Sequence, residues 1–271
     1  MNNAVERAAK CIWERYSEPL SLADIAKSAL LSRFHFSRIF RDTTSVSPCR
    51  FLSAVRIYQA KHMLLTTPMS ITDISFAVGY NSLGSFTNHF TCSVGVSPSL
   101  FRRTARNGGF EFPCPRQDWS PVHGVVYGTI SLPAGYAGAR VYLGTFKTAV
   151  VEQPPGAAAV IDVPADGRPC SYRLTNVPRG TWYIHAVGVA DSTDPEPWTR
   201  RTALVGTHDP VSVAAGAASR ATISLRPRRM TDPPVLLALP DLESRTSLPS
   251  ASRDVMPAMG SRAGRRLSGT P

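Results

Sequence analysis

Several features that would place this chain of 271 residues in common protein classes are scarce or absent. No apolar run approaches the ~20 residues that a membrane-spanning helix needs, so we expect no membrane partner. The first twenty residues alternate charged and apolar side chains and lack the apolar core of a signal peptide, which argues against export. The five cysteines are far apart and never form a CxxC pair, which argues against a disulfide framework and a structural zinc site. The predicted location is therefore the cytoplasm.

Acidic residues are also scarce, with 19 Asp and Glu against 30 Lys and Arg, and the formal net charge is +11. A pI near 9.9 favours a polyanionic partner, with nucleic acid ahead of a membrane surface. The excess is concentrated at the start, because residues 1–106 hold 13 basic and 6 acidic residues. We therefore expect the polyanion to bind mainly within residues 1–106.

The composition of the sequence and the spacing of its apolar residues change at three points, and these changes predict a multidomain chain. Apolar residues recur at helical spacing up to Arg106, and Gly and Pro then interrupt the pattern in a linker over 107–118. Short alternating runs rich in Val, Ile, Thr and Tyr occupy 119–226. Residues 227–271 are rich in Pro, Arg and Ser and are predicted to be a mostly disordered tail, with Val235–Leu239 as a stretch that could dock. The predicted fold is thus all-α, then an all-β antiparallel sandwich, then the tail.

The helical segment contains an internal repeat. The run Ser21–Ala26 (SLADIA) reappears 49 residues later as Ser70–Ser75 (SITDIS), and after one extra residue the offset becomes 50. At the second offset, Phe36 pairs with Phe86, Phe40 with Phe90, Phe51 with Phe101, and the Ser-Pro pairs at 47–48 and 97–98 coincide. The chain therefore contains two copies of one small helical unit.

Each copy is predicted to be a helix, a tight turn and a second helix. Ser21 and Ser70 are expected to cap the first helices, and Ser32 and Ser82 the second helices. On the second helix of the first copy, Phe36 and Phe40 share one face and should pack inward. The opposite face carries Phe34, Ser37, Arg38 and Arg41, which suits a helix that lies in a major groove. A solvated helix face is the simpler interpretation of such a stripe, but the duplicated unit on a basic segment favours DNA.

One continuous helix is predicted between the copies, from Pro48 to about Thr66, with Phe51, Val55, Tyr58 and His62 on one face. At 1.5 Å per residue such a helix is ~27 Å long. Two recognition helices held that far apart could enter successive major grooves, ~34 Å apart, on one side of a duplex.

These motifs resemble the DNA-binding domain of the AraC/XylS family of bacterial transcription regulators, over about Val5 to Arg103. The residues that carry the resemblance are Gly79-Tyr80, Ser82, Phe86, Phe90, Ser97-Pro98 and Phe101. The resemblance implies sequence-specific binding of double-stranded DNA in transcription regulation, as an activator or a repressor, with RNA polymerase as a candidate further partner. The residues expected at the DNA are Arg33, Phe34, Ser37, Arg38 and Arg41 in the first unit, and Ser82, Leu83, Gly84, Ser85, Thr87 and Asn88 in the second.

The second unit departs from the family in its charge. No Lys or Arg occurs between His62 and Phe101, and Asn88 takes the place equivalent to Arg38. Because phosphate contacts dominate affinity, the first unit is predicted to supply most of it.

The β-rich segment is predicted to have about seven strands, the sixth over Pro210–Val213 and the seventh over Ala221–Leu225. Its motifs Val126-x-Gly128-x-Ile130 and Gly180-Thr181-Trp182-Tyr183-Ile184 resemble a carboxypeptidase-regulatory (transthyretin-like) sandwich. Such a sandwich would be an interaction or effector module with a small-molecule or protein partner.

No catalytic or metal-ligating constellation is evident, so we expect neither an enzyme nor a cofactor. Two alternatives remain open. Pro48-Cys49-Arg50 is similar to part of the methyl-acceptor motif of DNA-repair proteins with an AraC-like unit, although the histidine of that motif is missing. A structural or secreted β-sandwich adhesin is the other alternative, and the repeat counts against it.

Overall fold

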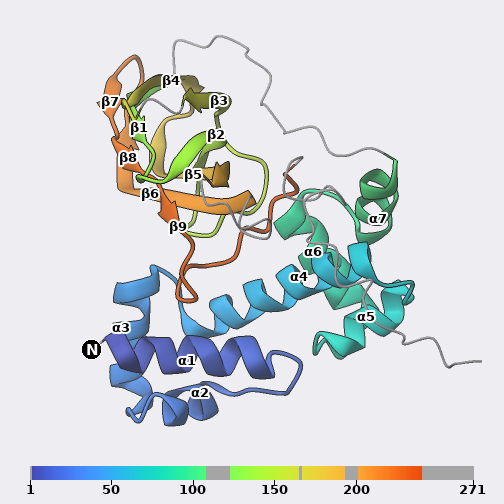
Figure 1. Ribbon diagram of the computed structural model, residues 1–271. Coiled ribbons are helices and arrows are strands. Elements are labelled where there is room, and N and C mark those ends of the chain that lie inside the picture. The colour runs from blue at the N-terminus through green and yellow to red at the C-terminus, as the bar shows by residue number, and fades with distance from the viewer. Residues whose placement is uncertain (1, 108–122, 165–166, 193–200, 240–271) are drawn as a thin grey trace, which may run out of the picture.

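A computed structural model describes residues 2–107, 123–164, 167–192 and 201–239 of the chain (Figure 1). The first of these ranges is entirely helical apart from short turns. Its helices are α1 (Asn2–Arg15), α2 (Leu22–Ser28), α3 (Arg33–Thr44), α4 (Pro48–Thr66), α5 (Ile71–Ala77), α6 (Leu83–Val94) and α7 (Pro98–Arg106). The connecting helix α4 has the predicted bounds, because Ser47 caps it and Pro48 occupies its first turn.

Serine caps begin most of the short helices. Ser21 and Asp24 form a reciprocal capping box at α2, in which the Asp24 amide donates to Ser21 Oγ at 3.2 Å. Ser70 accepts from the Asp73 amide at α5, and Ser82 accepts from the Ser85 amide at α6. Ser32 differs from the prediction, because it occupies the cap position of α3 but its side chain makes no capping hydrogen bond. Ser32 is exposed, so water can satisfy the first amides of α3.

The helical core forms around α4, which is buried on several faces because it contacts α1, α2, α3, α5, α6 and α7. Phe36, Phe40, Phe86 and Phe90 are fully buried in it, as predicted. Of the residues expected on one face of α4, Phe51 and Val55 are buried and His62 is exposed, whereas Lys61 beside it is buried.

The second half of the described chain is a β-rich region of two sheets. Its strands are β1 (Gly124–Ser131), β2 (Tyr136–Phe146), β3 (Ala158–Pro164), β4 (Cys170–Val177), β5 (Gly180–Ser192), β6 (Arg201–Val213), β7 (Ala218–Arg220), β8 (Ile223–Ser224) and β9 (Arg226–Pro227). One sheet has the order β4-β1-β7, with β8 also paired to β1, and the other has the order β3-β2-β5-β6-β9. A single apolar cluster, which includes Val126, Leu174, Ile184 and Leu204, contains buried residues from both sheets.

Three details of the strand prediction were wrong. The described region has nine strands and not about seven, because β7 and β9 were not predicted. The sixth strand begins at Arg201 and continues through Pro210, where the prediction had it begin. Proline lacks an amide proton, and this is tolerated because Pro210 lies where the β5–β6 register shifts, between Trp182 and Ile184 of β5. The region is also not purely antiparallel, because β7 and β8 run parallel to β1. The chain reaches β7 from the other sheet through the turn at Gly216, so no hairpin dictates its direction.

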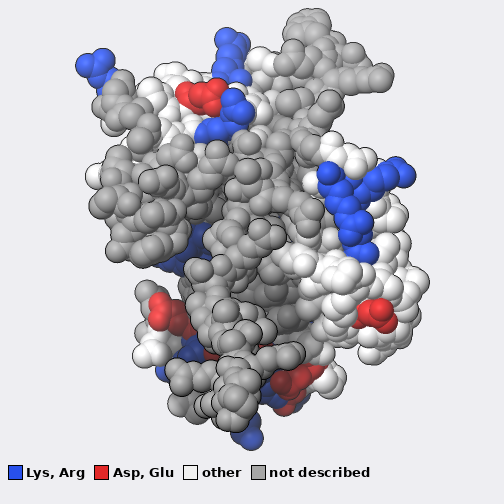
Figure 2. All heavy atoms as spheres, turned by 45° about the vertical axis from the view of Figure 1, so that its right-hand side comes forward, with Lys and Arg blue, Asp and Glu red and all other residues white. Residues whose placement is uncertain are grey.

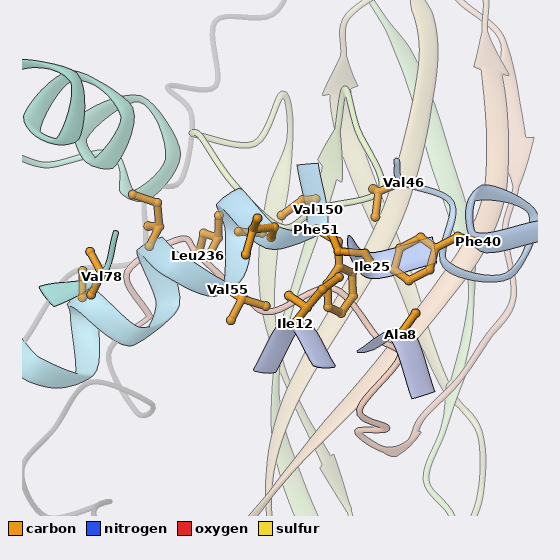
Figure 3. Packing of buried hydrophobic residues seen from close by; sticks show 14 of the residues in the cluster. Ala8, Ile12, Ile25, Phe40, Val46, Phe51, Val55, Val78, Val150 and Leu236 are labelled. Atoms are coloured by element: carbon orange, nitrogen blue, oxygen red, sulfur yellow. The ribbon is translucent and has the colours of Figure 1, made fainter. Parts of the chain in front are cut away.

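The segment from Arg228 to Leu239, hereafter the wedge segment, lies between the helices and the β-rich region (Figure 1). Leu236 and Ala238 are buried in the helical core, and Figure 3 shows Leu236 and Val150 beside α4. Val235, Leu237 and Leu239 are buried against Tyr142, Phe146, Val151 and Val187 of the β-rich region. The expectation that Val235–Leu239 could dock is confirmed, whereas the prediction of disorder was wrong for the rest of the wedge segment, and residues 240–271 lie outside the described residues.

The described helices also bear on the membrane prediction. None of them is long and apolar enough to cross a bilayer.

Candidate nucleic-acid interface

Helix α3 is held by its aromatic face. The rings of Phe36 and Phe40 lie 5.4 Å apart, and Phe40 lies 5.4 Å from Phe51 of α4 in an edge-on contact. This packing turns the other face of α3 to solvent. All five residues predicted for the first unit lie there: Arg33, Phe34, Arg38 and Arg41 are exposed, and Ser37 is half-buried.

Phe34 is the most informative member of that face. Its side chain is 87% exposed although it is a large aromatic, and it projects from the first turn of α3. Phe34 therefore lies on the same exposed face of α3 as the three arginines of that helix.

Helix α6 repeats this construction in the second unit. Phe86 packs against Phe90 at 5.7 Å, and Phe90 packs against Phe101 of α7 at 5.7 Å. The outward residues are again the predicted ones: Ser82, Leu83, Gly84, Ser85 and Asn88 are exposed, and Thr87 is half-buried. A Cβ added at Gly84 would meet no atom within 4 Å, so the backbone there is open to close approach.

A hydrogen bond that the sequence analysis did not anticipate braces α6. Tyr80 Oη and His89 Nδ1 are 2.7 Å apart, and the Tyr80 ring also packs edge-on against Phe86. Burial raises the pKa of the Tyr80 hydroxyl to about 12, so it stays protonated and can donate to the imidazole. Tyr80 belongs to the Gly-Tyr motif. His89 follows Asn88 and lies one helical turn after Ser85, and this spacing could have indicated that His89 lies on the same side of α6 as Ser85.

Three of the residues predicted for the second unit line one cavity. A cavity of about 470 Å³ is lined by Ser82, Ser85 and Asn88 together with Asn81 and His89. Leu83, Gly84 and Thr87 do not line this cavity. The outward face of α6 therefore combines amide, hydroxyl and imidazole groups, which can donate and accept hydrogen bonds without carrying a fixed charge.

The two units differ in charge as the sequence predicts. Helix α3 has three arginines, whereas α6 has no basic residue other than His89. Arginines return on α7 at Arg102, Arg103 and Arg106, but Arg102 donates to the carbonyls of Leu64 and Met69. On the face seen in Figure 2, lysines and arginines form separate groups and not one continuous patch. Helix α3 is consequently the more basic of the two candidate reading surfaces.

Cys49, the residue of the methyl-acceptor alternative, lies exposed in the first turn of α4. It lines a cavity of about 480 Å³ that also contains Cys92 and His89, and its neighbour Arg50 forms an ion pair with Glu152. Among the described residues, no group of three or more His, Cys, Asp or Glu side chains could hold a metal ion.

Comparisons with known proteins agree with this geometry. Residues 25–104 match the family described as a helix-turn-helix domain. The lactose operon transcription activator of Staphylococcus xylosus is 31% identical over 102 residues, which cover 38% of this chain and 37% of that protein. The Msm operon regulatory protein of Streptococcus mutans is 34% identical over 103 residues, with the same coverage of both chains. This chain thus spans little more than a third of the length of these relatives.

A solved structure is similar to part of this chain. It is the DNA-binding domain of the global transcriptional factor AdpA in complex with a target DNA, which is 27% identical. The match covers 39% of this chain and 95% of that chain, with a TM-score of 0.38. The family match and the duplicated helical unit agree that the N-terminal helices form a helix-turn-helix domain, and the chain is similar over about a hundred residues to these two transcription regulators.

Proposed function

We propose that this protein is a transcription regulator that binds specific sequences of double-stranded DNA in the bacterial cytoplasm, without enzymatic activity. The observation that carries the proposal is the pair of outward-facing helices, α3 and α6, on either end of the 19-residue helix α4. A helix of that length spans ~28 Å at 1.5 Å per residue. It can hold the two helices in successive major grooves on one side of a duplex.

Each unit has a distinct role in this proposal. In the first unit Arg33 and Arg41 contact phosphates, while Phe34, Ser37 and Arg38 face the base edges, where a guanidinium can bind guanine through two hydrogen bonds. In the second unit Ser82 and Thr87 lie at the margin, and Leu83, Gly84, Ser85 and Asn88 face the bases. Ser82 Oγ accepts the Ser85 amide and can still donate its hydroxyl proton to a phosphate.

The β-rich region is proposed to be a sandwich of the carboxypeptidase-regulatory type that serves as an interaction or effector module. What supports this is the shared apolar cluster between its two sheets. RNA polymerase is a candidate partner of a DNA-bound regulator, and a small molecule or a protein is a candidate partner of the module.

Selection of genomic fragments tests the function. The purified full chain is mixed with sheared genomic DNA, and bound fragments are recovered and sequenced. The proposal predicts a recurring motif with two half-sites about one helical turn apart. The double variant Phe34→Ala/Arg38→Ala should lose the motif, while Arg140→Ala, which removes one positive charge from the β-rich region, should retain it. Recovery of random sequence by the full chain would contradict the proposal.

The same protein tests the methyl-acceptor alternative. Cys49→Ser should bind the recovered motif as the wild type does, because Cys49 lies outside the two outward faces of α3 and α6. Transfer of a methyl group from methylated DNA to Cys49 would instead favour the repair function.

A further inference from the structure

The outer face of the four-stranded sheet carries a row of three side chains that the helix-turn-helix domain does not explain. In the register of this sheet, Tyr127 of β1 is paired with Arg173 of β4 on one side and with Arg220 of β7 on the other. Paired residues on neighbouring strands point to the same face, and strands lie ~4.8 Å apart, so the two arginines flank the tyrosine across ~10 Å. All three residues are exposed.

This row faces away from the rest of the molecule. The outer face of the five-stranded sheet is covered by the wedge segment through Tyr142, Phe146 and Val187, and the two sheets cover each other's inner faces. Strands β1, β4 and β7 lie on the side of the β-rich region away from the helices (Figure 1). None of the apolar clusters among the described residues covers the outer face of this sheet.

The charges of the row are not neutralised within the described chain. The four strands β1, β4, β7 and β8 contain no Asp or Glu. Two other arginines of the region are paired, because Arg140 binds Asp162 at 3.0 Å and Arg226 binds Asp232 at 2.6 Å. Among the described residues, Arg173 and Arg220 have neither an ion-pair partner nor a side-chain hydrogen bond.

The surroundings leave the row accessible to a flat ligand. Next to Tyr127 on the outward face of β1 is Thr129, whose partner on β4 is Ser171, and all the neighbours along these strands are short and uncharged. The tyrosine is 44% exposed, and no aromatic or cationic group of the described chain stacks on its ring. One face of an aromatic ring is thus available between two unpaired guanidinium groups.

We propose that this face, the Arg173–Tyr127–Arg220 row, binds a single-stranded nucleic acid segment. The two guanidinium forks match phosphodiester oxygens, and the tyrosine ring can stack on an unpaired base between them. A single strand fits better than a duplex because a duplex hides the faces of its bases inside its own stack. It fits better than an acidic peptide because a peptide carboxylate gives the exposed tyrosine ring nothing to stack on.

Binding of the full chain to a fluorescein-labelled ten-residue oligothymidylate, followed by anisotropy at low salt, tests this surface. The double variant Arg173→Gln/Arg220→Gln should weaken binding about tenfold and flatten its salt dependence. Tyr127→Leu should weaken binding about fivefold or more and leave the salt dependence unchanged, because stacking does not release counterions. Arg140→Gln, which removes one arginine charge from the other sheet, is the control and should bind as the wild type does.

Two further measurements separate this proposal from the function of the helix-turn-helix domain, on which it does not rest. Arg33→Ala/Arg38→Ala should weaken binding to duplex DNA while oligothymidylate binding persists. Loss of oligothymidylate binding in that variant, unaltered binding in the Tyr127 and Arg173/Arg220 variants, or absence of binding by the wild type would each overturn the proposal. Displacement of the oligonucleotide by polyglutamate as readily as by unlabelled oligothymidylate would also overturn it, since the surface would then recognise only negative charge.

Discussion

Leu30 and Gly79 occupy the same position in the two repeats, 49 residues apart, and both have a left-handed backbone, with φ of 59° and 87°. Each ends the turn that leads from the first helix of its unit toward the second. Glycine adopts this conformation without strain, whereas a left-handed backbone costs a leucine roughly 1–2 kcal/mol. The first unit therefore contains a strained residue where the second has the residue best suited to the turn.

Leu30→Gly should consequently stabilise the protein, by about 1 kcal/mol or less after the greater freedom of glycine in the unfolded chain is subtracted. Little packing is lost, because the Leu30 side chain is 80% exposed. Urea unfolding of both proteins measures the difference, and a clear loss of stability would show that the leucine side chain has a contact role.

Gly79→Ala should act in the opposite direction. A Cβ at this position would lie 2.8 Å from the carbonyl oxygen of Ser17 and 3.1 Å from the Arg56 guanidinium. Arg56 itself donates at 2.7 Å to the carbonyls of Tyr16 and Glu18, so it cannot move freely. We expect a loss of about 2–4 kcal/mol in the free energy of unfolding, from backbone strain and this clash together. Gly84→Ala, where a Cβ would be in open space, is the matched control and should change stability little.

The wedge segment should contribute to the stability of both halves of the protein. Leu236 is 1% exposed in the helical core, and its amide donates to the Val151 carbonyl at 2.8 Å. Leu236→Ala should lower the free energy of unfolding by about 2–5 kcal/mol, the usual cost of truncating a buried leucine. Met230→Ala is the control, because that side chain is 51% exposed and only its backbone carbonyl accepts from the Trp13 indole.

Lys61 provides a second test of the wedge segment. Its ammonium group is buried, and it donates to the carbonyls of Leu237 at 3.2 Å and Val235 at 3.5 Å. If these contacts anchor the segment, Lys61→Met should increase hydrogen exchange at residues 235–239, while His62→Met on the exposed side of α4 should not. Equal protection of the segment in both variants would show that apolar packing alone holds it.

The two recognition helices should contribute unequally to DNA affinity. Arg38→Ala should lose about 1–3 kcal/mol of binding free energy if its guanidinium contacts a base, and its salt slope should fall if it contacts a phosphate. Asn88→Ala should lose less affinity and leave the salt slope almost unchanged, because the amide carries no charge. Titrations of the selected DNA at three salt concentrations measure both effects. A larger loss for Asn88→Ala than for Arg38→Ala would contradict the dominance of the first unit.

His185 should make the β-rich region sensitive to acid. Burial lowers the pKa of this imidazole to about 4, and its ring nitrogens lie 3.2 Å from Thr207 Oγ1 and from the Thr148 carbonyl. The unfolded chain takes up a proton near pH 6.5, whereas the folded chain does so only near pH 4. Stability should therefore fall as the pH is lowered from about 6.5 to about 4 and then level off.

Thermal unfolding between pH 7 and pH 4 checks this expectation. His185→Asn should start from a lower stability at neutral pH and lose less of it on acidification, because the buried imidazole is gone. The control His62→Asn, at an exposed position, should follow the wild type. A wild-type profile in His185→Asn would assign the acid sensitivity to another group.

Several elements of the helix-turn-helix domain were predictable because local chemistry decides them. The bounds of α4 follow from the Ser47 cap and Pro48, and the burial of Phe36, Phe40, Phe86 and Phe90 follows from their spacing of four. The outward faces of α3 and α6 are the complements of these buried faces, so every residue predicted for them is exposed or half-buried. Because the unit occurs twice, the same pattern predicts the buried and the outward face in both α3 and α6.

Other features depend on residues that are distant in the sequence. The parallel pairing of β7 with β1 and the Arg173–Tyr127–Arg220 row exist only once three separate strands are in register. The charge of Lys61 is buried because two carbonyls of a segment more than 170 residues away satisfy it. Nothing in the immediate neighbourhood of Lys61 indicates that outcome.

The sequence by itself therefore determined the duplicated helix-turn-helix unit, the faces of its recognition helices and the imbalance of charge between them, because periodicity, caps and composition act over a few residues. Only the tertiary structure decided that Val235–Leu239 lies between the two halves of the protein. An apolar run within a polar tail can remain in water or be buried. Here two apolar surfaces face each other, and a segment whose side chains point alternately to one surface and the other is buried against both.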